Sequence, residues 1–309
     1  MELENDRMNY MKALVDVSSY LDTLKERVLA EIDQTRPNGE YRPDHAAWAI
    51  LAMGAFGKHF HLLERARTKL RKNQHEDGRG SVSPDHPEAF WPTQIAILAW
   101  HGSSQHQESL DRAVQFLLKT TGRHFDKGAG SPIDHDPSLR GWSWIADTHS
   151  MVEPTALGIL ALVSTGLREH ARTQEAVRML MDRQLPSGGW NYGNTIVYGQ
   201  ELHPQPENTG LALDAVAGFV PLEEVRHSLS YLEARVDKIR TPLSLGWAVL
   251  GLGAWGRRPE KARPLILECL KRQDQVGPYD PSNLSLLLVS FAATHGLLSV
   301  FVDGTETRR

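Results

Sequence analysis

Two kinds of apolar segment alternate along the chain. In the first kind, small and apolar residues cover nearly every side of a helix, and the segment ends at or near glycine. A helix that is apolar all round is buried, and glycine just after the last helical residue is a favourable C-terminal cap. Five such segments begin at Ala46, Thr93, Thr155, Thr209 and Ser244. They predict five inner helices.

A charged, amphipathic segment follows each inner segment. Its apolar residues recur every three or four positions, with Arg, Lys and Glu between them, which is typical of a half-buried surface helix. These segments end at Gln74, Thr120, Gln184, Val236 and Gln273. The alternation therefore predicts helical hairpins, each made of one inner and one outer helix.

Two further segments extend this series. A helix is expected around Asn9 to Ile32, and a last apolar helix from Asn283 to Leu298. No long stretch alternates with period two, and Ala, Leu, Arg and Glu dominate, so a sheet is not expected. We predict an all-α fold, an α/α toroid of about five to six hairpins. Residues 1–40 would form an N-terminal helix packed on the toroid, 41–300 the repeat domain, and 301–309 a short polar tail.

Composition and charge narrow the class of protein. The 309 residues are 40% hydrophobic and 23% charged, with a net charge of -4, so nucleic acid is not an expected partner. The N-terminus lacks a signal-peptide pattern, and no run of eighteen apolar residues predicts a transmembrane segment. We expect a cytoplasmic protein, with peripheral membrane association left open. Cys269 is the only cysteine, which excludes an intrachain disulfide and a thiolate-clustered zinc site.

One stretch resembles a known repeat. Residues 176–193, AVRMLMDRQLPSGGWNYG, combine an outer helix, Gln184, a glycine turn and Trp190. This order resembles the Gln-Trp repeat of the squalene–hopene cyclase and protein prenyltransferase superfamily, and residues 141–162 resemble the inner-helix entrance that follows such a repeat. The resemblance implies that Gln184 and Trp190 tie adjacent hairpins together. Weaker copies, which keep the Gln and the Gly, begin at Gln74 and Gln273.

Acidic residues recur at the start of the inner segments. When Thr155, Thr93, Thr209 and Ala46 are superimposed, the residues two positions earlier are Glu153, Trp91, Glu207 and Asp44. In a toroid with parallel inner helices, these side chains would surround one mouth. A carboxylate in the first turn also satisfies free backbone N–H groups and the helix dipole. Helix capping is therefore the alternative interpretation, above all for Asp44 and Glu207.

The resemblance gives Glu153 a specific role. Class II terpene cyclases protonate an alkene or epoxide with the middle residue of an Asp-x-Asp-Asp motif followed by Thr-Ala. Here the stretch from Met151 to Ala156 reads MVEPTA, so Glu153 occupies the place of the proton donor, while Met151 and Pro154 replace the flanking aspartates. The resemblance thus implies Glu153 as the catalytic acid, with Glu207 and Asp44 as further acidic candidates.

Such chemistry requires an apolar pocket with aromatic faces, because ring quadrupoles stabilise a carbocation. Aromatic residues near the starts of the inner segments are the candidates for substrate binding, although packing is the alternative for each. They are Phe90, Trp91, Trp142, Trp144, Tyr192 and Trp247. No metal site is expected, because Asp134, His135 and Asp136 lack a helical His or carboxylate pair and are better explained as a solvated turn. No cofactor is expected either.

Three functional hypotheses follow. The first is a terpenoid-cyclase-like protein that cyclises or binds a polyprenyl or squalene-like lipid in a central cavity. Because the usual class II cyclases build that cavity between two toroidal domains, a second toroid-domain chain is a candidate partner. The second is a carbohydrate-active toroid that uses Glu153 and Glu207 as its carboxylate pair. The third is a non-catalytic binding or scaffolding member of the repeat family.

Overall fold

A computed structural model describes residues 2–33, 41–83, 85–128 and 131–301. Most of the described chain is helical, as predicted, and one short antiparallel hairpin of strands β1 (Ile196–Val197) and β2 (Gln200–Glu201) interrupts it. The helices in chain order are α1 (Glu2–Ile32), α2 (Pro43–Ala55), α3 (Phe60–Lys72), α4 (Pro92–Trp100), α5 (Gln107–Lys119), α6 (Val152–Ser164), α7 (Ala171–Asp182), α8 (Pro206–Val216), α9 (Leu222–Glu233), α10 (Pro242–Ala254), α11 (Ala262–Lys271), α12 (Gln273–Val276) and α13 (Pro281–Ala292), with short 3-10 helices at Ser104–His106 and Val236–Lys238.

The inner and outer helices alternate as the apolar pattern predicts. Helices α2, α4, α6, α8, α10 and α13 are buried over most of their length, whereas α3, α5, α7, α9 and α11 each bury one face. The last inner helix is shorter than predicted. It ends at Ala292 because Ala293 adopts an extended backbone conformation, so the segment up to Leu298 does not continue the helix.

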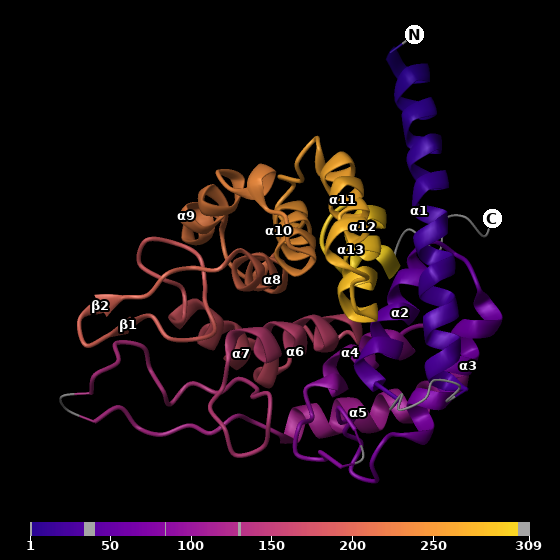
Figure 1. Ribbon diagram of the computed structural model, residues 1–309. Coiled ribbons are helices and arrows are strands. Elements are labelled where there is room, and N and C mark those ends of the chain that lie inside the picture. The colour runs from indigo at the N-terminus through magenta and orange to yellow at the C-terminus, as the bar shows by residue number, and fades with distance from the viewer. Residues whose placement is uncertain (1, 34–40, 84, 129–130, 302–309) are drawn as a thin grey trace.

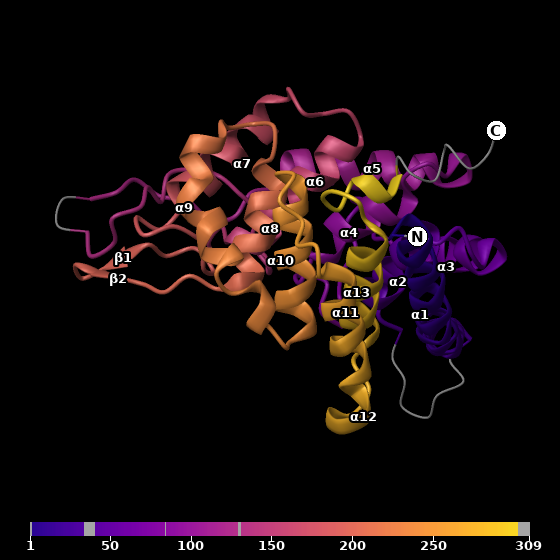
Figure 2. The same cartoon turned by 90° about the horizontal axis from the view of Figure 1, so that it is seen from above.

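The six inner helices contact one another in a cycle (Figures 1 and 2). Helix α2 packs on α4, α4 on α6, α6 on α8, α8 on α10, α10 on α13, and α13 packs back on α2. Each outer helix packs on the inner helix that precedes it in its hairpin. Helix α1 contacts α2, α3, α11 and α13, and its N-terminal end extends beyond the other helices (Figure 1).

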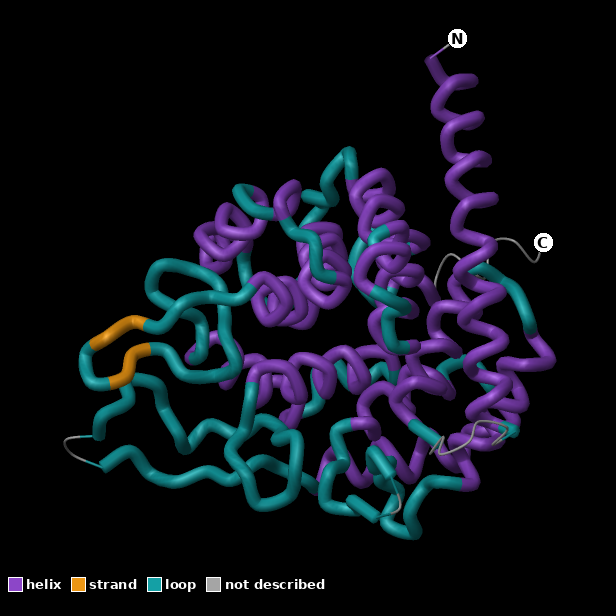
Figure 3. Tube along the Cα trace, in the orientation of Figure 1, coloured by secondary structure: helices purple, strands orange, loops and turns teal. Residues whose placement is uncertain are grey.

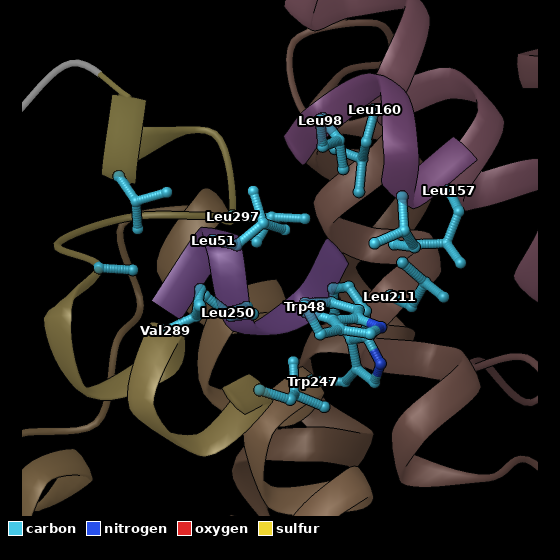
Figure 4. Close-up of a cluster of buried hydrophobic side chains, with 14 of the residues drawn as sticks. Trp48, Leu51, Leu98, Leu157, Leu160, Leu211, Trp247, Leu250, Val289 and Leu297 are labelled. Atoms are coloured by element: carbon cyan, nitrogen blue, oxygen red, sulfur yellow. The ribbon is translucent and has the colours of Figure 1, made fainter. Parts of the chain in front are cut away.

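Apolar side chains from all six inner helices meet in one cluster (Figure 4). Burial of these side chains is the main stabilising contribution, at about 25 cal/mol for each Å² of apolar surface removed from water. The labelled members are Trp48, Leu51, Leu98, Leu157, Leu160, Leu211, Trp247, Leu250, Val289 and Leu297. The space that the cycle of helices encloses is therefore largely filled by side chains.

Two glycines allow helices α8 and α10 to approach closely. A Cβ atom on Gly210 would lie 2.3 Å from the carbonyl oxygen of Trp247, and one on Gly251 would lie 2.2 Å from the carbonyl oxygen of Gly210. Any side chain at either position would push the two backbones apart. The small residues of the inner segments are thus needed where neighbouring inner helices meet.

Three threonines hold the loops that precede the inner helices. The hydroxyl groups of Thr93, Thr155 and Thr209 accept a backbone N–H bond from Gly80, Trp142 and Trp190, at 2.9, 3.0 and 2.9 Å. Each hydroxyl also lies within hydrogen-bonding distance of the carbonyl oxygen of the same residue, at 3.1, 3.3 and 3.2 Å. Of the four positions superimposed in the sequence, the three threonines therefore make equivalent contacts in the structure.

The Gln-Trp stretch connects α7 to its neighbours. The Gln184 amide donates a 2.8 Å hydrogen bond to the hydroxyl of Ser228 in α9, and the Trp190 indole donates a 2.7 Å bond to the carbonyl of Leu180 in α7. The earlier copy makes a similar link, because the Gln74 amide donates to the carbonyl of Ser109 in α5 at 2.9 Å. These side chains join one hairpin to the next.

Long loops gather on one side of the helices (Figure 3). Residues 131–151 and 183–205 lie beside each other. They are joined by the Asp134 N–H bond to the carbonyl of Ile196 and by the bridge between Ile133 and Val197. Among the described residues, no helix combines the length and the apolar character needed to cross a membrane.

Candidate functional site

A pocket of about 390 Å³ lies at the N-terminal ends of the inner helices. Its walls come from α2, α6, α10 and α13 and from the residues just before α2, α4 and α13. A larger groove of about 750 Å³ lies between the loop after α7 and helix α9, but its His203, His227 and Arg235 side chains are exposed. The smaller pocket is lined by the buried Asp44 and by Glu153, whose pKa is raised, and is the candidate site.

One side of the pocket is apolar and aromatic. Its lining residues are Trp48, Trp91, Leu157, Leu243, Trp247 and Leu286. The rings of Trp48 and Trp247 meet edge to face, with centroids 5.8 Å apart. Trp91 makes a similar contact with Trp144 at 5.7 Å, so Trp144 supports a wall of the pocket from behind. Three indole rings therefore face the same small volume.

Glu153 lies at this aromatic side, in the first turn of α6. The chain before it is extended at Met151, and Pro154 suits the first turn because its nitrogen has no hydrogen to donate. Burial, followed by the negative charge of Glu207, raises the pKa of Glu153 to about 8. None of the described residues forms a hydrogen bond or an ion pair with its carboxyl group. Glu153 is therefore a protonated acid at neutral pH.

The opposite side of the pocket is polar. Its lining residues are Arg42, Asp44, His45, Asp280, Ser282 and Asn283. Arg42 binds Asp44 with two parallel hydrogen bonds of 2.9 and 2.8 Å. Burial lowers the pKa of Arg42, but Asp44, Glu31 and Asp280 outweigh it and raise the pKa. Asp44 is only 2% exposed, so its charge is held in this pair.

His45 and Asp280 complete the polar side. The His45 Nδ1 atom lies 3.2 Å from Glu31 of α1, and its Nε2 atom lies 4.0 Å from Asp44. Asp280 is the N-cap of α13 and accepts the backbone N–H groups of Ser282 and Asn283 at 2.9 and 3.0 Å. The motif DPSN, an acidic cap followed by proline, was the available signal for Asp280, but the superposition of the inner segments did not include it.

Glu207 lies outside the pocket lining. Its Oε2 atom accepts a 2.7 Å hydrogen bond from the hydroxyl of Ser244, which connects α8 to α10. It acts on the site through its charge, which raises the pKa of Glu153. Of the three predicted acidic residues, the structure brings Glu153 and Asp44 to the pocket and leaves Glu207 beside it.

Besides Trp144, three of the predicted aromatic residues lie outside the lining. Trp142 is fully buried, donates to the carbonyl of Leu117 at 2.9 Å, and carries the guanidinium of Arg172 over its ring at 4.1 Å. Phe90 is buried against Phe116, with centroids 5.4 Å apart. Tyr192 is 50% exposed on a loop. Trp142 and Phe90 fill packing positions, whereas Trp48, which the sequence interpretation omitted, lies in the pocket one helical turn after Asp44.

The Asp134–Asp136 segment, predicted to be a solvated turn, lies just before a turn at Pro137 and Ser138, and His135 is buried. Asp136 accepts hydrogen bonds from the backbone N–H and the hydroxyl of Ser138 at 2.9 and 2.7 Å, and these bonds lower its pKa. Within the described part of the chain, no three His, Cys, Asp or Glu side chains are grouped as a metal site would require.

The functional interpretation depends on this geometry. The pocket combines a protonated carboxyl group, three indole rings and a polar side that carries an ion pair. Comparison with models of known protein families and with curated proteins gives no match for this chain.

Proposed function

We propose that the helical hairpins form an α/α toroid and that its mouth is the site of a terpenoid-cyclase-like reaction, initiated by proton transfer from Glu153 to an isoprenoid alkene. The closed cycle of contacts from α2 to α13 supports the toroid. The observation that carries the reaction is the carboxyl group of Glu153, whose pKa of about 8 keeps it protonated beside Trp48, Trp91 and Trp247.

The chemistry uses the carboxyl and the rings together. The Glu153 O–H proton is transferred to one alkene carbon, whose π electrons form the new C–H bond, and the other carbon becomes a carbocation. Indole faces stabilise this positive charge. A second alkene of the same molecule then forms the ring bond, and loss of a proton to the Glu153 carboxylate restores the acid. The overall reaction is an isomerisation, so it consumes no other reactant.

The size of the pocket limits the length of the substrate that it can hold. A volume of about 390 Å³ is near the lower end of the roughly 300–1,000 Å³ range of small-molecule sites. Beyond Trp48 and Trp247, the leucine cluster of Figure 4 fills the enclosed space. This arrangement supports a short prenyl substrate rather than one of the length of squalene.

The pocket supports the carbohydrate alternative less well. That reaction requires two carboxyl groups that face each other across the bound sugar. Glu207 lies outside the lining and is bonded to Ser244, and Asp44 is bonded to Arg42. Neither is placed to act as a second catalytic group for Glu153.

The test is product analysis by gas chromatography and mass spectrometry. The wild-type protein is incubated with geraniol, farnesol, geranylamine and squalene, beside Glu153→Gln and the control Glu169→Gln, which changes an exposed glutamate outside the pocket. We expect a cyclic product from wild type and Glu169→Gln, and none from Glu153→Gln. Activity should fall as the pH rises through about 8, where Glu153 loses its proton. Turnover that survives Glu153→Gln would overturn the assignment, and binding without turnover would favour a non-catalytic role.

A further inference from the structure

The charged carboxylates of the pocket and the protonated acid Glu153 come from different inner helices. Asp280 caps α13, and Glu153 begins α6. In the cycle of inner helices, α13 and α6 are separated by α2 and α4 in one direction and by α8 and α10 in the other. A ligand that spans the pocket therefore meets Asp280 and Asp44 at one end and the Glu153 acid at the other.

The charges at the polar end do not balance. Of the described residues that line the pocket, Arg42 alone carries a permanent positive charge, and Asp44 occupies its Nε and Nη2 groups with two hydrogen bonds. His45 is directed toward Glu31, a second carboxyl group. Among the described residues that line the pocket, Asp280 has no paired cation, and only the more distant Arg42 attracts its charge. Its oxygen atoms accept hydrogen bonds from the backbone of Ser282 and from the backbone and side-chain amide of Asn283. Outside the lining, Arg27 of α1 donates to the carbonyl of Tyr279, the residue before Asp280. Counted over its described lining residues, the polar end thus has two carboxylates, Asp44 and Asp280, and one guanidinium, Arg42.

The balance of charges at the polar end favours one class of ligand head group over others. A phosphate or diphosphate would bring further negative charge beside Asp280 and Asp44 and would find the guanidinium of Arg42 already occupied. A protonated amine would be attracted by the same carboxylates, and its charge could also contact the indole faces. An uncharged alcohol would gain neither interaction.

We propose that this pocket takes a short prenyl amine, with its ammonium group at Asp280 and Asp44 and its chain along Trp48, Trp91 and Trp247. The inference rests on the proposed function for the isoprenoid nature of the chain. The charge of the head group follows independently, from Arg42, Asp44 and Asp280. Asp280 is then a residue that determines specificity.

The experiment compares three ligands that share one chain, geranylamine, geraniol and geranyl phosphate. Their binding to the full chain is measured by isothermal titration calorimetry at pH 7, with wild type and with Glu153→Gln, in which turnover is blocked. We expect geranylamine to bind about tenfold more tightly than geraniol and geranyl phosphate to bind most weakly, because a half-buried charge pair is worth about this much.

Two variants test the origin of this order. Asp280→Asn keeps a good N-cap for α13 but removes the charge, so it should weaken geranylamine about tenfold and leave geraniol unchanged. Asp44→Asn releases the guanidinium of Arg42, so it should strengthen geranyl phosphate by a similar factor. Both effects follow from the same charge balance, but the first changes the binding of the cationic ligand and the second changes the binding of the anionic ligand.

The outcomes separate this inference from the proposed function. Equal binding of geranyl phosphate and geranylamine to wild type, or an equal effect of Asp280→Asn on amine and alcohol, would overturn the amine assignment and leave the acid chemistry of Glu153 unaffected. Amine binding that depends on Asp280, without turnover of any prenyl substrate, would support this inference and overturn the reaction. If none of the three ligands binds, both fail.

Discussion

Replacing Glu153 with glutamine should make the protein more stable at neutral pH. Burial and the charge of Glu207 raise the pKa of Glu153 from 4.5 to about 8. Between these two pH values the unfolded chain has released the proton that the folded chain still holds. The contribution of Glu153 to the free energy of unfolding is therefore fully present below pH 4.5 and is lost as the pH rises toward 8. Glutamine is neutral in both states and avoids this loss.

The magnitude follows from the size of the shift. Each pH unit between the two pKa values costs about 1.4 kcal/mol, so the loss is about 3 kcal/mol at pH 7. The carboxyl group faces a pocket rather than a closed interior, and solvent in the pocket reduces the figure. We expect Glu153→Gln to be about 2 kcal/mol more stable than wild type at pH 7, and the difference to fall below about 1 kcal/mol at pH 5.

Urea denaturation followed by circular dichroism at pH 5, 6, 7 and 8 measures this difference, with the free energy of unfolding obtained by linear extrapolation. Glu169→Gln, at an exposed position, is the matched control and should follow wild type at every pH. A stability difference that does not change with pH would refute the reasoning. So would a Glu153→Gln protein that is less stable than wild type at pH 7, because the buried carboxyl would then be ionised or held by a favourable contact.

Three further predictions test the same structure. Glu207→Gln removes a negative charge that raises the pKa of Glu153, so the loss of activity at high pH should begin at a lower pH in the pH–rate profile. Gly210→Ala should destabilise the protein by about 3 kcal/mol or more in urea denaturation, because its Cβ would lie 2.3 Å from a carbonyl oxygen of α10, whereas Gly54→Ala, with open space around its Cβ, should be neutral or slightly stabilising. Thr155→Val leaves the buried N–H before α6 without its 3.0 Å partner and should lower the free energy of unfolding by about 1–3 kcal/mol.

The helices and their layers could be predicted from the sequence because the information is local. The all-apolar segment at residues 155–163 requires burial, and the amphipathic segment at 174–184 requires one buried face, whatever the rest of the chain does. The threonine superposition succeeded for a similar reason. The same hydroxyl makes the same pair of backbone bonds at Thr93, Thr155 and Thr209, so each repeat carries its own signal.

The composition of the pocket could not be predicted in the same way. Trp91 and Trp142 both lie shortly before an inner helix in the sequence, yet Trp91 faces the pocket and Trp142 fills the space between α5 and α7. This choice depends on the guanidinium of Arg172 and on Gly158, which leaves room for the Trp142 ring. Both neighbours come from later parts of the chain. The periodicity of apolar residues in the sequence does not determine which way an indole ring points.

The three acidic positions of the repeat show how one location in the fold can acquire different chemistry. Asp44, Glu153 and Glu207 all lie in the first turn of an inner helix. Asp44 is neutralised by Arg42, and Glu207 accepts a hydrogen bond from Ser244. Glu153 has neither kind of partner among the described residues, and the neighbouring charge of Glu207 raises its pKa further. The position whose charge is not compensated is the one that keeps its proton at neutral pH. The loss of stability that Glu153→Gln should reverse and the retained proton that the proposed reaction transfers therefore have the same physical origin, the raised pKa of Glu153.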